Sequence, residues 1–221
     1  MKRVAAIIVA AGEGRRFGAA KQFLTLKGKP VVDWSIAALA AHPEVDEVIL
    51  VLPDDSQQEH YFSLYKKVSA VAAGGPRRQD SVARGFERLN AAQTAVVLVH
   101  DGVRPVLSAD LIGRVIAEAR RSGAAIPALP VEETIKEVEE GAVLRTVERE
   151  RLFRVQTPQG FSYEVLAQAL KQAAADRFYG TDEAGLVERT GHRIAVVEGD
   201  PRNIKVTAPA DLKIAEVLLE G

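Results

Sequence analysis

Cysteine is absent from the 221-residue sequence. Disulfide bonds, zinc–thiolate sites and cysteine nucleophiles are therefore excluded. The absence is consistent with a reducing compartment, and we expect a cytoplasmic location. Long apolar runs are also lacking, because no stretch approaches the roughly 20 residues that span a bilayer. The apolar run near the N-terminus is followed at once by glycines and charges, so we interpret it as a buried strand and not as a signal peptide.

An excess of charge of one sign is lacking too, since 29 basic and 30 acidic side chains give a net charge of −1. This balance argues against a general attraction to nucleic acids or membranes, so any anion site must be built locally. The four histidines (His42, His60, His100 and His192) are scattered without metal-ligand spacing. The chain also has no Gly-x-Ser-x-Gly elbow, which leaves a serine hydrolase unsupported.

Short apolar runs alternate with helical patterns along most of the chain. This alternation predicts crossover connections and a single α/β domain over residues 1–221, with a Rossmann-like, mostly parallel sheet flanked by helices. Strands are expected at Val4–Val9, Glu47–Leu52, Ser69–Ala73, Ala95–Val99, Ala124–Leu129, Arg193–Glu198 and Ile204–Val206. Helices are expected at Val31–Ala41, Asp80–Leu89, Ala109–Arg121 (capped by Ser108), Glu164–Ala175, Thr181–Thr190 and Ala210–Glu220 (capped by Thr207).

The pattern changes after Pro130, where apolar residues become sparse among many charges. A Glu140-Gly141 turn divides this segment, and we predict a β-hairpin arm embedded at residues 131–157. A two-stranded ribbon with so little apolar surface is marginal in water and needs something to pack against. We therefore expect a homodimer formed through this arm.

A glycine-rich segment follows the first predicted strand. Gly12, Gly14 and Gly18 give the spacing G-x-G-x-x-x-G, which differs from the dinucleotide-binding fingerprint, and no Gly-Lys-Ser/Thr follows to make a P-loop. What remains is a turn whose glycines let backbone N–H groups approach an anion closely.

Three cations, Arg15, Arg16 and Lys21, follow these glycines. They would supply charge to phosphate oxygens, as a bound triphosphate requires. The simpler alternative is a strand-to-loop turn with solvated cations, and the concentration of three cations in one loop favours the phosphate site.

Five motifs, taken in chain order, resemble those of known enzyme families. "AAGEGRRFG" with "KQF" resembles the signature loop of nucleotidyltransferases that join a nucleoside triphosphate to a sugar or polyol phosphate. Together the set resembles the 2-C-methyl-D-erythritol 4-phosphate cytidylyltransferases of the non-mevalonate isoprenoid pathway, over essentially the whole chain. That family implies a nucleotide-diphospho-sugar transferase fold with a protruding hairpin. The other motifs are "VLVHDGVRP" (Val97–Pro105), "TPQGF" (Thr157–Phe161), "TDEA" (Thr181–Ala184) and "NIKVT" (Asn203–Thr207).

The chain departs from the family pattern at three places. Val9 stands where the family often has proline, and "HDGVRP" replaces the more frequent "HDAARP" while keeping Asp101 and Arg104. Arg202 precedes Asn203 where some members carry an acidic residue, so no carboxylate contact is carried over to that position.

The resemblance implies a reaction in which a phosphate oxygen of methylerythritol phosphate attacks the α-phosphorus of CTP and pyrophosphate leaves. Positioning and charge stabilisation dominate such chemistry, since the attacking phosphate is already an anion. By resemblance, Arg16 and Lys21 are the catalytic residues that stabilise the transition state. Mg²⁺ or another divalent cation is expected to arrive with CTP, and the sequence leaves its protein ligands open.

The acceptor also needs cations to hold it. By resemblance, Arg149 and Lys205 orient methylerythritol phosphate with Thr134, and in relatives the arm reaches into the neighbouring subunit's site. An exposed ion-pair face is the alternative for Arg149. Asp101 follows a strand end and is expected to contact ribose, substrate hydroxyls or Mg²⁺, whereas Arg104 either positions substrate or pairs with Asp101.

Cytosine needs an acceptor for its amino group and donors for its ring acceptors, and exposed backbone can supply both. A plain turn is the alternative for the Gly74-Gly75 pair. Lesser site candidates are Thr157, Thr181 and Asp182, for which capping or turn roles are the alternative. The expected nucleotide-binding residues are Ala10, Ala11, Gly12, Gly14, Gly74, Gly75 and Ser81.

Two other functions remain open at this point. A ribitol-5-phosphate cytidylyltransferase would share the glycine loop and the "HDGVRP" strand end, although "PVEETIK" (Pro130–Lys136) with "TVERERLF" fits the methylerythritol family better. A nucleotide-binding module without catalysis would be expected to lack Lys21 or Lys205, and both are present. A dinucleotide-dependent oxidoreductase is excluded by the glycine spacing.

Overall fold

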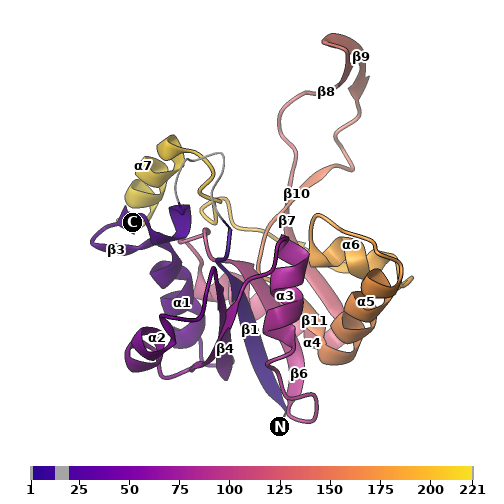
Figure 1. Cartoon of the computed structure of the whole chain (residues 1–221). Coiled ribbons are helices and arrows are strands. Elements are labelled where there is room, and N and C mark those ends of the chain that lie inside the picture. The colour runs from indigo at the N-terminus through magenta and orange to yellow at the C-terminus, as the bar shows by residue number, and fades with distance from the viewer. Residues whose placement is uncertain (1, 13–19, 221) are drawn as a thin grey trace.

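A computed structural model describes residues 2–12 and 20–220 of the chain (Figure 1). Its centre is a twisted sheet whose neighbouring strands are far apart in sequence. The strand order is β10 (Phe153–Val155), β7 (Ala124–Pro130), β11 (Gln159–Ser162), β6 (Thr94–Asp101), β1 (Arg3–Val9), β4 (Glu47–Leu52) and β5 (Val68–Ala73), and β12 (Ala195–Glu198) also pairs with β7.

The middle of the sheet is parallel, as predicted. β1 pairs in parallel with β4 and β6, and β4 with β5. Residues 4–8 of β1 are completely buried because helices cover both faces, which explains the unbroken apolar run in the sequence. The exceptions are β11, which runs antiparallel to both β6 and β7, and the edge strand β10, which runs antiparallel to β7.

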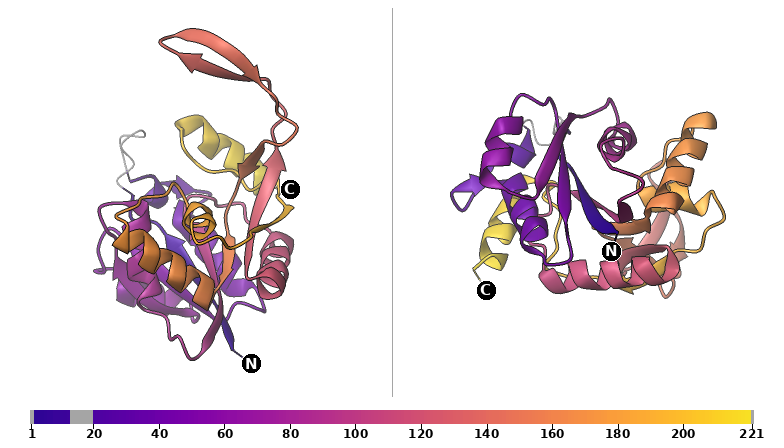
Figure 2. Two further views of the ribbon diagram at one scale, coloured as in Figure 1. Left: turned by 90° about the vertical axis from the view of Figure 1, so that its right-hand side faces the viewer. Right: turned by 90° about the horizontal axis from the view of Figure 1, so that it is seen from below.

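Helices cover both faces of the sheet, as Figures 1 and 2 show. Alternate β1 side chains point to opposite faces, so that Ile8 packs in one core and Ile7 in the other. The first core contains α1 (Val31–Ala41), α2 (Gln58–Leu64) and α4 (Ala109–Ser122). The second contains α3 (Arg78–Phe86), α5 (Tyr163–Ala175) and α6 (Glu183–Glu188). A third core lies beneath α7 (Pro209–Leu218), near the short elements η1 (Lys21–Phe23), β2 (Thr25–Leu26) and β3 (Lys29–Pro30).

Two predicted local features near the C-terminus are wrong. Ile204–Val206 is not a strand, because its Val206 N–H donates to the Val103 carbonyl at 2.9 Å inside an irregular segment. Thr207 does not cap the last helix. The carboxylate of Asp211 accepts from the Thr207 and Ala208 N–H groups at 2.7 and 2.8 Å, and the Thr207 hydroxyl itself donates to Asp211.

The arm is a two-stranded ribbon of β8 (Ile135–Glu139) and β9 (Ala142–Val147) that projects away from the body (Figures 1 and 2). The predicted turn is confirmed, since Glu140 and Gly141 have φ values of 49° and 82°, as a tight hairpin turn requires. The predicted range 131–157 also contains β10, which pairs with β7 in the central sheet, so the projecting part is shorter than that range. Within residues 2–12 and 20–220, no helix has the length and apolarity needed to cross a bilayer.

Candidate functional site

A cleft of about 380 Å³ opens at the carboxyl ends of the parallel strands, where open α/β sheets hold their ligands. It lies beyond the ends of β1 and β6 and beside the start of α3. The described residues that line it are Val9, Ala10, Ala11, Gly12, Lys21, Gln22, Gly75, Pro76, Arg77, Arg78, Ser81, Asp101, Val103 and Lys205.

A second cavity of about 220 Å³ adjoins the first. The two share Arg78, Asp101 and Lys205, which therefore form the boundary between them. Two neighbouring compartments can hold two ligands side by side. The remaining lining residues of the second cavity are Arg104, Val155, Gln156, Thr157, Gln159, Thr181 and Asp182.

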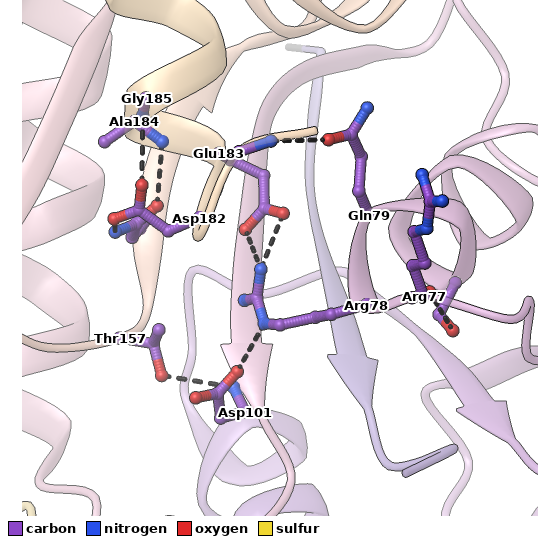
Figure 3. A network of polar contacts seen from close by, with 12 residues as sticks. Arg77, Arg78, Gln79, Asp101, Thr157, Asp182, Glu183, Ala184 and Gly185 are labelled. Carbon is purple, nitrogen blue, oxygen red and sulfur yellow. Dashed lines mark hydrogen bonds and ion pairs between the residues drawn. The ribbon is translucent and has the colours of Figure 1, made fainter. Parts of the chain in front are cut away.

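The boundary is part of a row of alternating charges, of which Figure 3 shows Glu183, Arg78 and Asp101. Arg78 Nη1 donates to both oxygens of Glu183, at 2.7 and 2.8 Å, and Arg78 Nε donates to one oxygen of Asp101 at 2.9 Å. The other oxygen of Asp101 accepts from Lys205 Nζ at 2.7 Å. The row joins α6, α3, the end of β6 and the 203–207 segment, so groups from four parts of the chain are fixed together.

These contacts set the charges of the two carboxyl groups. Burial by itself would raise the pKa of Asp101, but Arg78 and Lys205 outweigh it and hold that pKa well below its usual range. For Glu183 burial prevails and raises its pKa, with Arg78 as the main opposing influence. Asp101 is thus a permanent anion at neutral pH and cannot serve as a general acid.

The backbone of Asp101 is fixed as well. Its N–H donates to the Thr157 hydroxyl at 3.1 Å, and that hydroxyl lies 3.1 Å from Nδ1 of the fully buried His100. Burial lowers the pKa of His100 to about 4, so the ring is neutral at pH 7 and has a structural role beside Asp101. Thr157 therefore supports the site from the wall of the second cavity.

The Gly74-Gly75 turn packs tightly against the end of β1. A Cβ atom on Gly74 would lie 2.1 Å from the Cβ of Ala11, so only glycine fits there. The Gly74 N–H donates to the Leu52 carbonyl at 2.6 Å, and the Gly75 N–H donates to the Ser81 hydroxyl at 3.1 Å. Both N–H groups are thus bonded within the protein, while Gly75 and Ser81 line the cleft, so a role of this turn in binding cytosine stays a prediction.

Several predicted residues of the first compartment line the cleft. Ala10, Ala11 and Gly12 follow β1, and Lys21 enters from η1. The pKa of Asp211 is lowered, against the opposing effect of burial, mainly by hydrogen bonds from Thr207 and Ala208 and to a smaller extent by the charge of Lys21. Two other predictions, Arg16 and Gly14, lie outside the described residues.

Of the residues predicted to position the acceptor, Lys205 and Arg104 both line the second cavity. The suggested pairing of Arg104 with Asp101 is not the contact found, because the Asp101 carboxylate is bound by Arg78 and Lys205. Arg104 instead donates from Nη1 to the Asn203 carbonyl at 2.8 Å. Its Nε is buried without a hydrogen-bond partner in the described part of the chain.

Arg149 and Thr134 lie at the base of the arm, exposed and outside both cavities of their own chain. Arg149 donates to the Glu132 carbonyl. Of the lesser candidates, Asp182 has the capping role given as its alternative above. Asp182 caps α6 by accepting from the Gly185 N–H at 3.0 Å, although it and Thr181 also line the second cavity.

Sequence reasoning missed the group that docks α3 beside the cleft. Arg78 binds Glu183, while its neighbour Arg77 stacks 3.4 Å from the centre of the Tyr179 ring. Gln79 donates to the Phe178 carbonyl at 3.1 Å and accepts from the Gly180 N–H at 3.0 Å. The available signal was two adjacent arginines after a Gly-Gly-Pro turn, together with the glutamate inside "TDEA".

A metal ion has few protein ligands available here. The residues 2–12 and 20–220 contain no group of three histidine or acidic side chains that could hold a metal ion. Asp101 is the acidic residue among those lining the larger cleft, and it already binds two cations. This donor set fits a Mg²⁺ ion that arrives with substrate phosphates better than a metal held in a protein cage.

Comparisons with known proteins agree with this geometry. The family model described as IspD: 2-C-methyl-D-erythritol 4-phosphate cytidylyltransferase matches residues 4–221. The protein of that name from Geobacter metallireducens is 41% identical over 229 residues, which cover 98% of this chain and 97% of the relative. Its counterpart from Pelotomaculum thermopropionicum is 43% identical, with coverage of 100% and 96%. The crystal structure of the 2-C-methyl-D-erythritol 4-phosphate cytidylyltransferase from Thermus thermophilus superposes with a TM-score of 0.84 at 38% identity, covering 99% of this chain and 100% of that one.

Proposed function

The chain belongs to the 2-C-methyl-D-erythritol 4-phosphate cytidylyltransferase family, and from that premise we propose how its residues carry out the reaction. The protein is a nucleotidyltransferase. It transfers a cytidylyl group from CTP to 2-C-methyl-D-erythritol 4-phosphate, giving 4-diphosphocytidyl-2-C-methyl-D-erythritol and pyrophosphate for isoprenoid biosynthesis. The observation that carries the residue assignment is the pair of adjoining cavities with Asp101 and Lys205 between them.

CTP occupies the larger cleft in this proposal, with its triphosphate near Gly12 and Lys21. A phosphate oxygen of the acceptor attacks the α-phosphorus, and the bond from that phosphorus to the bridging oxygen breaks to release pyrophosphate. No proton has to move in this step, which agrees with the fixed negative charge of Asp101. Lys21, together with Arg16, stabilises the charge that builds up on the phosphoryl oxygens and on the leaving group.

Methylerythritol phosphate occupies the second cavity. Lys205 and Arg104 supply positive charge to its phosphate, and Arg suits bidentate phosphate contacts. Asp101 and Thr157 offer acceptors to its hydroxyl groups. Lys205 borders both cavities, so the nucleophilic phosphate is held next to the α-phosphorus, and this proximity accounts for much of the rate.

Mg²⁺ accompanies CTP and neutralises part of the triphosphate charge, which is the chemistry the ion supplies when bound. Asp101 is the protein group best placed to approach it. Because Arg78 and Lys205 already bind the Asp101 carboxylate, we propose that the metal is bound mainly through the nucleotide phosphates.

A homodimer completes the site in this proposal. The arm carries Arg149 and Thr134 away from the cavities of its own chain, and its strands expose Val143 and Leu144 at 60% and 56%. Exposed apolar side chains on a ribbon that cannot fold alone favour packing against a second copy. We also propose a cytoplasmic location, in keeping with the absence of cysteine.

The direct test is pyrophosphate release from CTP and Mg²⁺ with methylerythritol phosphate as the acceptor. Parallel reactions contain ribitol 5-phosphate as the acceptor, or ATP, GTP or UTP as the nucleotide. Release is expected with CTP and methylerythritol phosphate. Faster release with ribitol phosphate would overturn the acceptor assignment, and no release from protein shown to be folded would overturn the catalytic role of the cleft.

A further inference from the structure

Lys205 lies in a segment that has no helix or strand of its own. Residues 199–208 connect β12 to α7 as irregular chain. A lysine side chain has four rotatable bonds, and its position is no better defined than the backbone that carries it. Something must therefore hold this segment against the sheet.

Asn203 provides the first anchor. The residue is completely buried, and its Nδ2 donates to the Thr157 carbonyl at 2.7 Å. Thr157 lies just before β11, which is hydrogen-bonded on both sides, to β6 and β7. The anchor thus ties the irregular segment to the start of a strand that is paired on both sides.

Gln156 provides a second anchor, at Asp200. Its side-chain amide donates to the Asp200 carbonyl at 2.8 Å and accepts from the Asp200 N–H at 3.0 Å. The Asn203 N–H donates to that same Asp200 carbonyl at 2.9 Å. The side-chain amides of Gln156, which lies between β10 and β11, and of Asn203, which lies in the segment, therefore hold residues 199–208 against the sheet.

From this geometry we infer that Asn203 is a positioning residue for the acceptor side of the site. Its side chain fixes the backbone two residues before Lys205, and its carbonyl receives the Arg104 guanidinium at 2.8 Å. One buried amide thereby sets the positions of Arg104 and Lys205, two of the cations that line the second cavity. The inference rests on the acceptor-binding role proposed above for Lys205.

A packing role alone does not explain an asparagine here. Its Oδ1 is buried and has no hydrogen-bond partner among the described residues. A buried acceptor left without a partner lowers stability, so an apolar side chain of similar volume would serve packing as well or better. The directional bond to Thr157 is what the amide adds.

The test compares Asn203→Leu, which keeps the volume and removes the amide, with Asn90→Leu as the matched control. Asn90 is exposed and far from the cleft, where its Oδ1 accepts from the Ala92 N–H at 3.0 Å. We expect Asn203→Leu to lower kcat/KM for methylerythritol phosphate by about ten- to a hundredfold, the cost of displacing a bound group by about 1 Å. The control should stay within about twofold, because a surface change far from the site moves no reacting group.

A double variant separates positioning from loss of structure. Where Asn203 acts through Lys205, the combined loss in Asn203→Leu/Lys205→Ala is smaller than the product of the two single losses. Losses that multiply in full, in protein with an unchanged melting temperature, would overturn the inference. Should the leucine variant not fold, Asn203→Ser and Gln156→Leu put the same question with smaller or more peripheral changes.

The outcomes also distinguish the inference from its premise. Full activity in Lys205→Ala would contradict the proposed role of Lys205 itself. Impaired activity in Lys205→Ala together with normal acceptor kinetics in Asn203→Leu would leave the proposed function standing and overturn the positioning role of Asn203.

Discussion

Arg78 Nε lies 2.9 Å from Oδ1 of Asp101 and joins the start of α3 to the end of β6. The same guanidinium binds Glu183, which is 1% exposed. One planar fork thus satisfies two buried carboxylates from opposite sides, a geometry that an ammonium group cannot reproduce.

Replacing Arg78 by methionine keeps much of the side-chain volume and leaves Asp101 and Glu183 without this cation. We expect the free energy of unfolding to fall by about 3–5 kcal/mol, because unpaired buried charges are costly. Urea unfolding measures this free energy, and Arg88→Met, at an exposed position, is the control. Adding Glu183→Gln should recover part of the loss, and an Arg78→Met protein as stable as its parent would contradict the role of the pair.

Lys21→Ala tests the transition-state role of the residue that enters the cleft from η1. We expect kcat to fall by about 10²–10³, as for the loss of one group that stabilises a developing charge. The melting temperature should change little, since the residue is only partly buried. Lys171→Ala, on the exposed face of α5, removes the same charge and should leave kcat unchanged. A kcat for Lys21→Ala equal to that of the control would rule out the catalytic role.

Gly74→Ala tests how closely the Gly74-Gly75 turn approaches β1. The new Cβ would lie 2.1 Å from the Ala11 Cβ and 3.2 Å from the Leu52 carbonyl oxygen, so the turn must shift. We expect a loss of about 1–3 kcal/mol in stability and a higher KM for CTP. Gly113→Ala is the control, because its nearest neighbour there is His42 Nε2 at an ordinary 3.7 Å and α4 favours alanine. Equal effects of the two changes would contradict the close approach.

The fold was predictable where burial leaves a regular trace in the sequence. β4 and α1 have the predicted bounds. A strand that is buried on both faces appears in the sequence as an unbroken apolar run, and a helix appears as apolar residues that recur every three to four positions. β11 was missed because its four residues carry one large apolar side chain, Phe161, and its stability comes from pairing with strands on both sides. Such pairing is a property of the assembled sheet.

Some residues of the candidate site could also be predicted from the sequence, and others could not. Asp101 and Lys205 could be predicted because each belongs to a motif, and Asp101 ends a strand. Arg78, the other partner of Asp101, could not, because it lies 23 positions from Asp101 and meets Glu183 across 105 positions of sequence. A pair of charges that far apart in the chain carries no periodicity, and only the fold brings it together.

The fully buried His100 gives a testable pH dependence. Its pKa in the folded protein is lowered from 6.5 to about 4 by burial, so between these values the unfolded chain binds a proton that the native state does not. Stability therefore falls as the pH drops through this window, by up to about 3 kcal/mol from this residue. His100→Asn, which can still meet the Thr157 hydroxyl, should show a flatter profile in urea unfolding. His60→Asn on exposed α2 should keep the parent's profile, and identical slopes in all three proteins would contradict the assignment.

The arm provides the sharpest test of a shared site, because Arg149 and Lys21 lie on parts of one chain that do not meet. A subunit with Arg149→Ala keeps Lys21, and a subunit with Lys21→Ala keeps Arg149. In a symmetric dimer with exchanged arms, mixing the two rebuilds one complete site per heterodimer, so activity should return to about half that of the parent dimer. Each variant alone should stay impaired, and Leu144→Glu on the exposed β9 strand should weaken both dimerisation and recovery. If purified heterodimers showed no more activity than the separate variants, Arg149 would not act across the interface.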